Sequence, residues 1–187
     1  GLTYKNSPVM SFSEALNGLT DGTCHMLASA TSTKERQQKL LFTPPYTRTK
    51  QSILTKKSAS PISDLSDHLS SKFAVIKNSV NETALKRLYP GLQLIPVDTS
   101  VEGAMLVNKN EVLGYINSIH VLLKLIEQEK LTDLKINGQL RSQLDDVQSI
   151  ALSKNQPVLH SILSKAISYT PKDEIESIVS HKFSLSN

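Results

Sequence analysis

Residues 29–46 read SATSTKERQQKLLFTPPY, and the rest of the chain is organised around this stretch. Small hydroxyl residues open it, a charged cluster follows, and an apolar pair leads into two consecutive prolines. Thr33 can cap a helix over residues 34–39, because its hydroxyl can accept a hydrogen bond from an N–H of the first turn. Residues 40–42 are expected to form a short buried strand. The prolines then force a change of direction, since they donate no backbone hydrogen bond.

The chemistry of this stretch suits an anion. Exposed hydroxyls, the free N–H groups of a helix start and the guanidinium of Arg36 together can bind a carboxylate. The alternative is that Arg36 is an ordinary solvated cation on a helix surface. On composition alone, that plainer interpretation is the favoured one.

Composition limits the possible functions. The 187 residues are enough for one large domain or two small lobes, and 39% hydrophobic with 20% charged residues indicates a packed core. The net charge is +4, but the basic residues are scattered and only 5% of residues are aromatic. A nucleic-acid surface is therefore not expected.

Other classes of site lack their signatures. A single cysteine, Cys24, permits no intrachain disulfide and no cysteine-based zinc site, and we expect a buried, inert thiol. The five histidines are widely separated, and no catalytic or phosphate-loop motif is present. We expect no metal, no cofactor and no catalysis. The sequence has no apolar run of about 18 residues and no signal peptide. Because it starts at Gly1, we expect a processed or excised piece.

Hydrophobic periodicity and breaker residues predict alternating elements. Strands are expected at residues 2–5, 24–28, 51–56, 72–77, 93–97, 112–116, 134–136 and 147–152. Helices are expected after Ser11 or Ser13, near 62–69, and at 80–88, 101–107, 118–130, 158–169 and 172–181. The alternation of strands and helices over residues 51–138 predicts a mostly parallel α/β sheet.

Three motifs carry a family resemblance: T-x-x-R ending at Arg36, the FTPPY run at residues 42–46, and the VDT run at 97–99. Together they resemble type II periplasmic solute-binding proteins of the amino-acid class. They are most similar to Venus-flytrap sensor domains of BvgS/EvgS-type hybrid histidine kinases. The resemblance implies a two-lobed α/β fold. Lobe 1 would comprise residues 1–48 and 143–187, and lobe 2 residues 49–142. It also implies that lobe 1 is incomplete, because the family's opening strand and helix are missing.

The resemblance also implies site residues. Arg36 would clamp a ligand carboxylate, and Ser29 and Thr31 would face the cleft, although both can also cap a strand end. Asn78 and Ser79 would present helix N–H groups from the opposite lobe, with a plain helix cap as the equal alternative. Ser118, after the strand at residues 112–116, completes the set of candidates. For Asp98 and Thr99 we favour a helix N-cap, with Glu102 in the first turn.

The class of ligand can be predicted from an acidic residue that the family has and this sequence lacks. In the family, an acid after the strand equivalent to residues 112–116 pairs with a ligand ammonium group, but Asn117 and Ser118 stand here. A buried ammonium without a paired acid costs several kcal/mol. We therefore predict that free α-amino acids are not bound tightly. The cleft would hold a small carboxylate through Arg36, Thr31 and Ser79, or nothing.

Three functions remain open. The first is a periplasmic sensor domain that closes on a small ligand, and the second is a signalling module with an empty cleft that acts through contacts between domains. The third is a solute-binding protein of an ABC transporter. The expected partners are a small molecule or none, adjacent sensor domains of the same chain, and a second copy in a homodimer.

Overall fold

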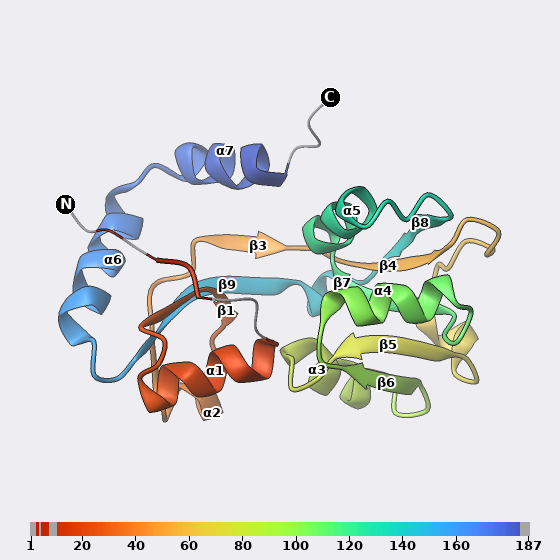
Figure 1. Ribbon diagram of the computed structural model, residues 1–187, viewed down its shortest axis with the longest axis horizontal. Helices are drawn as coiled ribbons and strands as arrows, with labels where there is room; N and C mark the ends of the chain where they lie inside the picture. The colour runs from red at the N-terminus through yellow and green to blue at the C-terminus, as the bar shows by residue number, and fades with distance from the viewer. Residues whose placement is uncertain (1–2, 4, 8–10, 184–187) are drawn as a thin grey trace.

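The computed structural model describes residues 3, 5–7 and 11–183, which form two α/β lobes lying side by side (Figure 1). This confirms the fold class expected from the sequence. The helices are α1 (Phe12–Asp21), α2 (Lys34–Gln37), α3 (Val80–Leu88), α4 (Ser100–Asn108), α5 (Ile119–Gln128), α6 (Pro157–Tyr169) and α7 (Lys172–Phe183). Two 3₁₀ turns, η1 (Leu65–His68) and η2 (Ser142–Leu144), complete the helical elements of the described part.

Lobe 1 is built on the long strand β9 (Asp146–Ser153). The strands β1 (Met26–Thr31), β2 (Leu40–Phe42) and β3 (Thr47–Thr49) all pair with it in antiparallel orientation. The buried hydrophobic cluster of this lobe is small, with Leu19, Ala30, Leu40 and Ala151 as its members. Within the described residues β1 pairs only with β9. The predicted incompleteness of this lobe stays a prediction.

Lobe 2 contains a five-stranded sheet in the order β6-β5-β7-β4-β8. These strands are β4 (Gln51–Lys56), β5 (Lys72–Ile76), β6 (Gln93–Val97), β7 (Gly114–Ser118) and β8 (Leu134–Gln139). The pairs β5–β6 and β5–β7 are parallel, whereas β4 is antiparallel to both of its neighbours. Four of the five strands thus run in the same direction, as the expected mostly parallel sheet requires, and β4 is the exception. The sheet is mixed because β4 enters from lobe 1 and runs against the other four strands.

Both faces of the lobe 2 sheet are buried, because successive residues of a strand point to opposite sides. Leu54 and Ala74 belong to the cluster packed under α4 and α5. Their neighbours Ile53, Phe73 and Val75 belong to the cluster on the other face, together with Leu85 of α3. This double core makes lobe 2 the larger hydrophobic unit.

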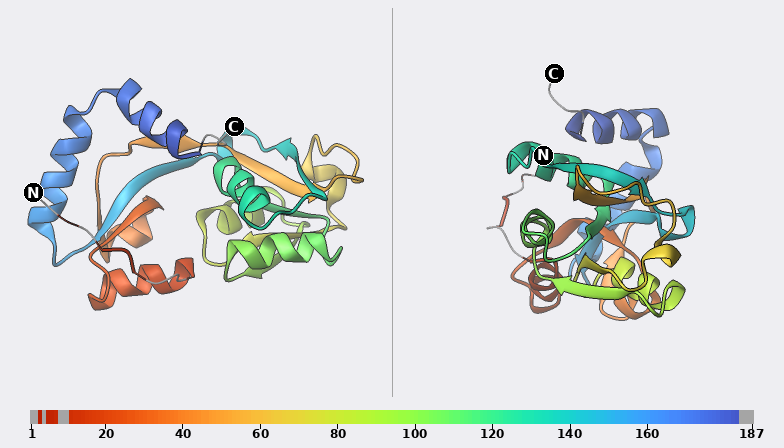
Figure 2. Two further views of the ribbon diagram at one scale, coloured as in Figure 1. Left: turned by 45° about the horizontal axis from the view of Figure 1, so that its top comes forward. Right: turned by 90° about the vertical axis from the view of Figure 1, so that its right-hand side faces the viewer.

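Two segments connect the lobes. Only Lys50 separates β3 from β4, and η2 separates β8 from β9. After β9 the chain forms α6, which packs on β2, and α7, which turns back and contacts α5 of lobe 2 (Figure 2). The lobe boundaries inferred from the sequence, residues 1–48 and 143–187 against 49–142, stay a prediction.

Several predicted element boundaries need correction. The strand expected at residues 24–28 is β1, which starts two residues later because the Cys24 N–H still donates to the Gly18 carbonyl that closes α1 (2.9 Å). Cys24 is half-buried rather than buried. The strand expected to stop at Asn137 continues to Gln139, because Gly138 pairs with Ile53 at a register shift. The strand expected at residues 2–5 falls largely outside the described residues.

Candidate functional site

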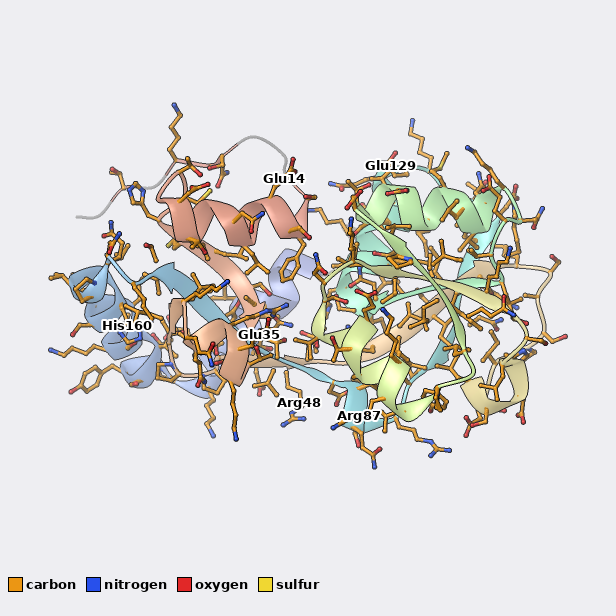
Figure 3. All side chains as sticks on the ribbon, turned by 90° about the horizontal axis from the view of Figure 1, so that it is seen from below. Glu14, Glu35, Arg48, Arg87, Glu129 and His160 are labelled. Carbon is orange, nitrogen blue, oxygen red and sulfur yellow. The ribbon has the colours of Figure 1, made fainter. Side chains whose placement is uncertain are left out.

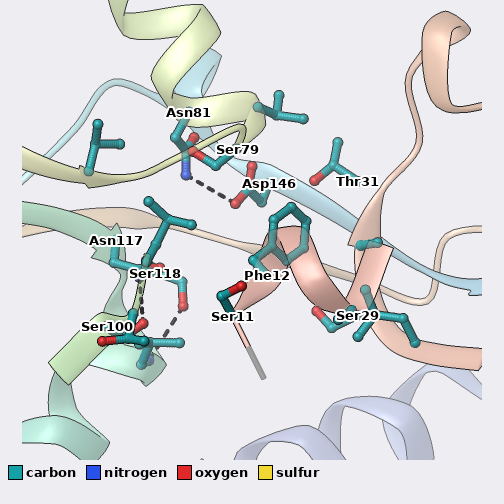
Figure 4. Close-up of a pocket in the computed structure, with 18 of the residues that line it drawn as sticks. Ser11, Phe12, Ser29, Thr31, Ser79, Asn81, Ser100, Asn117, Ser118 and Asp146 are labelled. Atoms are coloured by element: carbon teal, nitrogen blue, oxygen red, sulfur yellow. Dashed lines mark hydrogen bonds between the residues drawn. The ribbon is translucent and has the colours of Figure 1, made fainter. Parts of the chain in front are cut away.

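A cavity of about 490 Å³ lies between the two lobes and is lined by residues of both (Figure 4). Lobe 1 contributes residues of α1, β1 and α2. Lobe 2 contributes the ends of the strands β5 and β7 and the first turns of the helices α3, α4 and α5. The strand β9 supplies Asp146 and Gln148. Figure 4 shows Asp146 between the side chains of lobe 2 and Thr31 of lobe 1. The connection from β8 to β9 thus ends at this cavity, because Asp146 is the first residue of β9.

Arg36 joins the lobes from one side of the cavity. Thr33 caps α2 as predicted, since its hydroxyl accepts from the Arg36 N–H at 3.2 Å. The Arg36 guanidinium donates through Nη1 to the Thr31 carbonyl (2.9 Å) and through Nη2 to the Asn78 carbonyl across the cleft (3.0 Å). It also lies 5.2 Å from the centre of the Phe12 ring. Burial lowers the pKa of Arg36, against the raising effects of Asp146 and Glu35. Two of its donors are therefore already used by backbone carbonyls.

Asn78 forms the other half of this contact. Its φ of 59° is left-handed, a conformation that asparagine tolerates better than most residues. The Asn78 N–H donates to Glu82 Oε2 at 2.7 Å, and its side chain donates to Ser13 Oγ of lobe 1 at 3.1 Å. Asn78 does not line the cavity, so the structure places it at the junction of the lobes. A ligand role for it stays a prediction.

The four serine and threonine candidates all line the cavity. Ser79 and Ser118 also cap α3 and α5, with hydroxyls that accept from Glu82 N (3.1 Å) and Val121 N (3.4 Å). Ser29 donates to Gln148 Oε1 at 2.6 Å, and the Thr31 carbonyl accepts from Arg36. Ser79 therefore both caps α3 and lines the cavity. Contact of any of these residues with a ligand stays a prediction.

A polar network lies on the lobe 2 side of the cavity. Thr99 is the N-cap of α4, as predicted, and accepts from Glu102 N at 3.1 Å. The fully buried Tyr115 donates to Ser100 Oγ at 3.1 Å and accepts from the side chain of Asn117. Burial raises the pKa of Tyr115 to about 12, although both hydrogen bonds lower it. The phenol is therefore a neutral structural group at physiological pH.

Sequence reasoning missed Asp146. It opens β9, and its Oδ2 accepts from Gln51 Nε2 (3.0 Å) and Asn81 Nδ2 (3.2 Å), both from lobe 2. Burial raises the pKa of Asp146 to about 6, while hydrogen bonds from Asn81 and Thr31 and the charge of Arg36 lower it. The signal in the sequence was the acidic pair Asp145-Asp146 directly before the return strand. Only the fold shows that the second of the two faces the cleft.

Two features are absent from the part of the chain that the structure describes. Its residues contain no cluster of His, Cys, Asp or Glu able to hold a metal ion. None of its helices is both long and apolar enough to cross a membrane. Charged side chains such as Arg48, Arg87 and Glu129 are distributed over both lobes (Figure 3).

Comparison with known proteins gives a family for this geometry. The sequence model of the bacterial extracellular solute-binding proteins, family 3, matches residues 1–184. The virulence sensor protein BvgS of Bordetella bronchiseptica is 25% identical over 181 residues, which are 96% of this chain and 14% of that protein. The chain thus spans only 14% of the length of the curated relatives it matches.

Solved structures agree with this assignment. The periplasmic VFT2 domain of Bordetella pertussis BvgS aligns with a TM-score of 0.79 and 25% identity, over 92% of this chain and 73% of that one. An ancestral arginine-binding protein, solved with arginine bound, aligns with the same TM-score of 0.79 at 24% identity, over 94% and 78% of the two chains. The second likeness shows the fold alone.

Proposed function

Because the chain belongs to family 3 of the bacterial extracellular solute-binding proteins, we propose that it is a periplasmic Venus-flytrap domain of a two-component hybrid sensor histidine kinase. In this role it senses by the closing of its two lobes. The domain itself has no catalytic function, and any kinase activity lies elsewhere in the full-length protein. The similarity to the sensor BvgS over 96% of this chain supports the assignment.

The observation that carries the proposal is the pair of contacts that close the lobes over the cavity. Arg36 and Ser13 of lobe 1 both bond to Asn78 of lobe 2, at 3.0 and 3.1 Å. Domains of this architecture change shape by hinge motion around a ligand, with a few connecting residues absorbing the change. Here the connections are Lys50 and the short segment containing η2. The contacts at Asn78 must break whenever the lobes open.

The sequence leaves two hypotheses for the contents of the cleft. Either a small carboxylate is held by Arg36, Thr31 and Ser79, or the cleft holds no ligand. In either case the signal passes through the relative position of the lobes. Adjacent sensor domains of the same chain, or a second copy, then receive it. We propose that the contact of α7 with α5 transmits the signal between such neighbours and lobe 2.

Locking the lobes tests the proposal. Ser13 and Asn78 are replaced by cysteine, in a Cys24→Ser background, within the protein as its genome encodes it. A short thiol cross-linker then joins the lobes across the 3.1 Å contact. The expected result is a fixed phosphorylation output that added solutes no longer change. The single-cysteine variants, treated identically, are the matched controls.

The same variants separate the sensor from its alternative, the solute-binding protein of an ABC transporter. If the locked protein abolishes solute uptake and no phosphorylation output depends on it, the transporter function is correct and the sensor proposal fails. Reading the gene beyond residue 187 gives an independent check. A membrane-spanning segment followed by a kinase core agrees with the sensor, whereas a stop codon contradicts it.

A further inference from the structure

The carboxylate of Asp146 is held in place by neutral groups only. Gln51 and Asn81 donate amide N–H groups to the same oxygen, Oδ2, at 3.0 and 3.2 Å. The side chain of Thr31 also forms a hydrogen bond with this carboxylate. Among the ion pairs formed by the described residues, none involves Asp146. The carboxylate is thus oriented by lobe 2 while its charge lacks a direct counter-ion.

The charges around the cavity favour a cation. Among the described lining residues the acids are Asp98 and Asp146, and the one cation is Arg36. Two guanidinium donors of Arg36 already bond to backbone carbonyls. The other acid, Asp98, lies with its Oδ1 3.9 Å from Lys77 Nζ, in a pair whose side chains are more than half exposed. An anionic ligand would add to the negative charge beside Asp146, whereas a cation would compensate it.

The rest of the lining fits a small amine. Hydroxyls from both lobes can accept from the N–H groups that an ammonium does not direct at Asp146. Apolar side chains provide contact for an alkyl chain. These groups are Ser29, Ser79, Ser118, Phe12, Val101 and Val121.

We propose that Asp146 anchors an amine subsite in the cleft, where it binds the ammonium group of a small solute that carries no carboxylate. This inference rests on the proposed function, since it names the ligand class of the same cleft. It also revises the ligand expected from the sequence. The acid is absent at the end of β7, where Asn117 and Ser118 lie, but β9 supplies one from the junction of the lobes.

Binding of an ammonium group must be linked to protons. Burial places the pKa of Asp146 at about 6, and the charges acting on it are Arg36, which lowers the pKa, and Asp145, which raises it. Asp98 is the other acid of the lining. A bound cation favours the ionised carboxylate and so lowers its pKa. Below the pKa, amine affinity should therefore fall up to about tenfold per pH unit, with release of a proton on binding.

Calorimetric titration of the 187-residue chain tests the subsite, with ethanolamine, putrescine and succinate as probes. We expect the two amines to bind at millimolar concentrations or tighter near neutral pH, and succinate to bind more weakly. Asp146→Asn should weaken amine binding at least about tenfold, because it removes the charge but keeps the shape. Asp145→Asn, one residue away and outside the lining, is the matched control. It should bind like the wild type near neutral pH, where Asp146 is ionised with or without the raising effect of Asp145 on its pKa.

Titrations at about pH 5.5 in two buffers of different ionisation enthalpy should show proton release for the wild type and none for Asp146→Asn. Thermal melting establishes that the variant is folded. Equal amine binding by the variant and the wild type, or no amine binding by the wild type, overturns the subsite. If succinate binds instead and Arg36→Ala abolishes it, the subsite is wrong while the sensor function stands. That function fails separately, through the cross-linking experiment.

Discussion

The side chain of Asp146 makes stability depend on pH in an unusual direction. A carboxyl whose folded pKa is about 6, raised from 3.8 by burial, binds protons more readily in the folded than in the unfolded state. Its contribution to stability is therefore fully present below about pH 4. It is lost as the pH rises through the folded value. This is the reverse of an ordinary paired aspartate.

Asp146→Asn should accordingly raise the free energy of unfolding at pH 7, by about 1–3 kcal/mol, and give little gain near pH 4. Urea unfolding of the variant and the wild type across this pH range measures the difference between their free energies of unfolding. Groups that titrate alike in both proteins cancel in this difference. A gain that is the same at both pH values would mean that the effect comes from hydrogen bonding rather than from charge.

The packing of α4 on β7 depends on one glycine. A Cβ added at Gly103 would lie 2.7 Å from two ring carbons of Tyr115, which is fully buried and hydrogen-bonded to Ser100. The ring cannot move aside without breaking that bond. The helix must therefore shift away from the sheet if the side chain becomes larger.

Gly103→Ala should therefore lower the free energy of unfolding by about 1–3 kcal/mol, despite the higher helix propensity of alanine. Chemical denaturation provides the measurement. Gly91→Ala is the control, because its added Cβ would meet Leu69 at 3.5 Å, an ordinary contact. Similar losses for both substitutions would show that the close approach to Tyr115 is not the cause.

The relation between the two lobes depends on Arg36, whose guanidinium bonds to a carbonyl in each. Arg36→Ala removes both bonds and leaves two carbonyls without this donor. The closed arrangement should lose about 1–3 kcal/mol, since hydrogen bonds from charged groups have that order of strength. Small-angle X-ray scattering should then show a larger radius of gyration. Arg36→Lys should fall in between, because lysine cannot reach both carbonyls with a planar fork.

Arg48→Ala serves as the control for this measurement. Arg48 lies in β3 close to the crossing between the lobes, but its side chain is exposed. The substitution Arg48→Ala changes the net charge by the same amount as Arg36→Ala but leaves the contact at Asn78 intact. An unchanged radius of gyration in Arg36→Ala would mean that Arg36 does not hold the lobes together.

Local sequence determined most of the elements and the family. Features that depend on interactions within a few residues are displayed directly by a sequence. They include the helix caps Thr33, Ser79 and Thr99, the left-handed Asn78 and the strands β2, β4 and β6. The T-x-x-R and FTPPY motifs pointed to the family for the same reason. Element ends were less predictable where a partner strand decides them, as for β1 and β8.

Tertiary structure alone decided the direction of β4 and the chemistry of the cleft. Strand direction depends on where the chain enters the sheet, which hydrophobic periodicity does not record. Arg36, Asn78 and Asp146 are far apart in sequence and meet only because β3–β4 and β8–β9 cross between the lobes. The raised pKa of Asp146 likewise comes from burial by both lobes. No local pattern contains it, since the same Asp145-Asp146 pair on a surface would be two ordinary solvated acids.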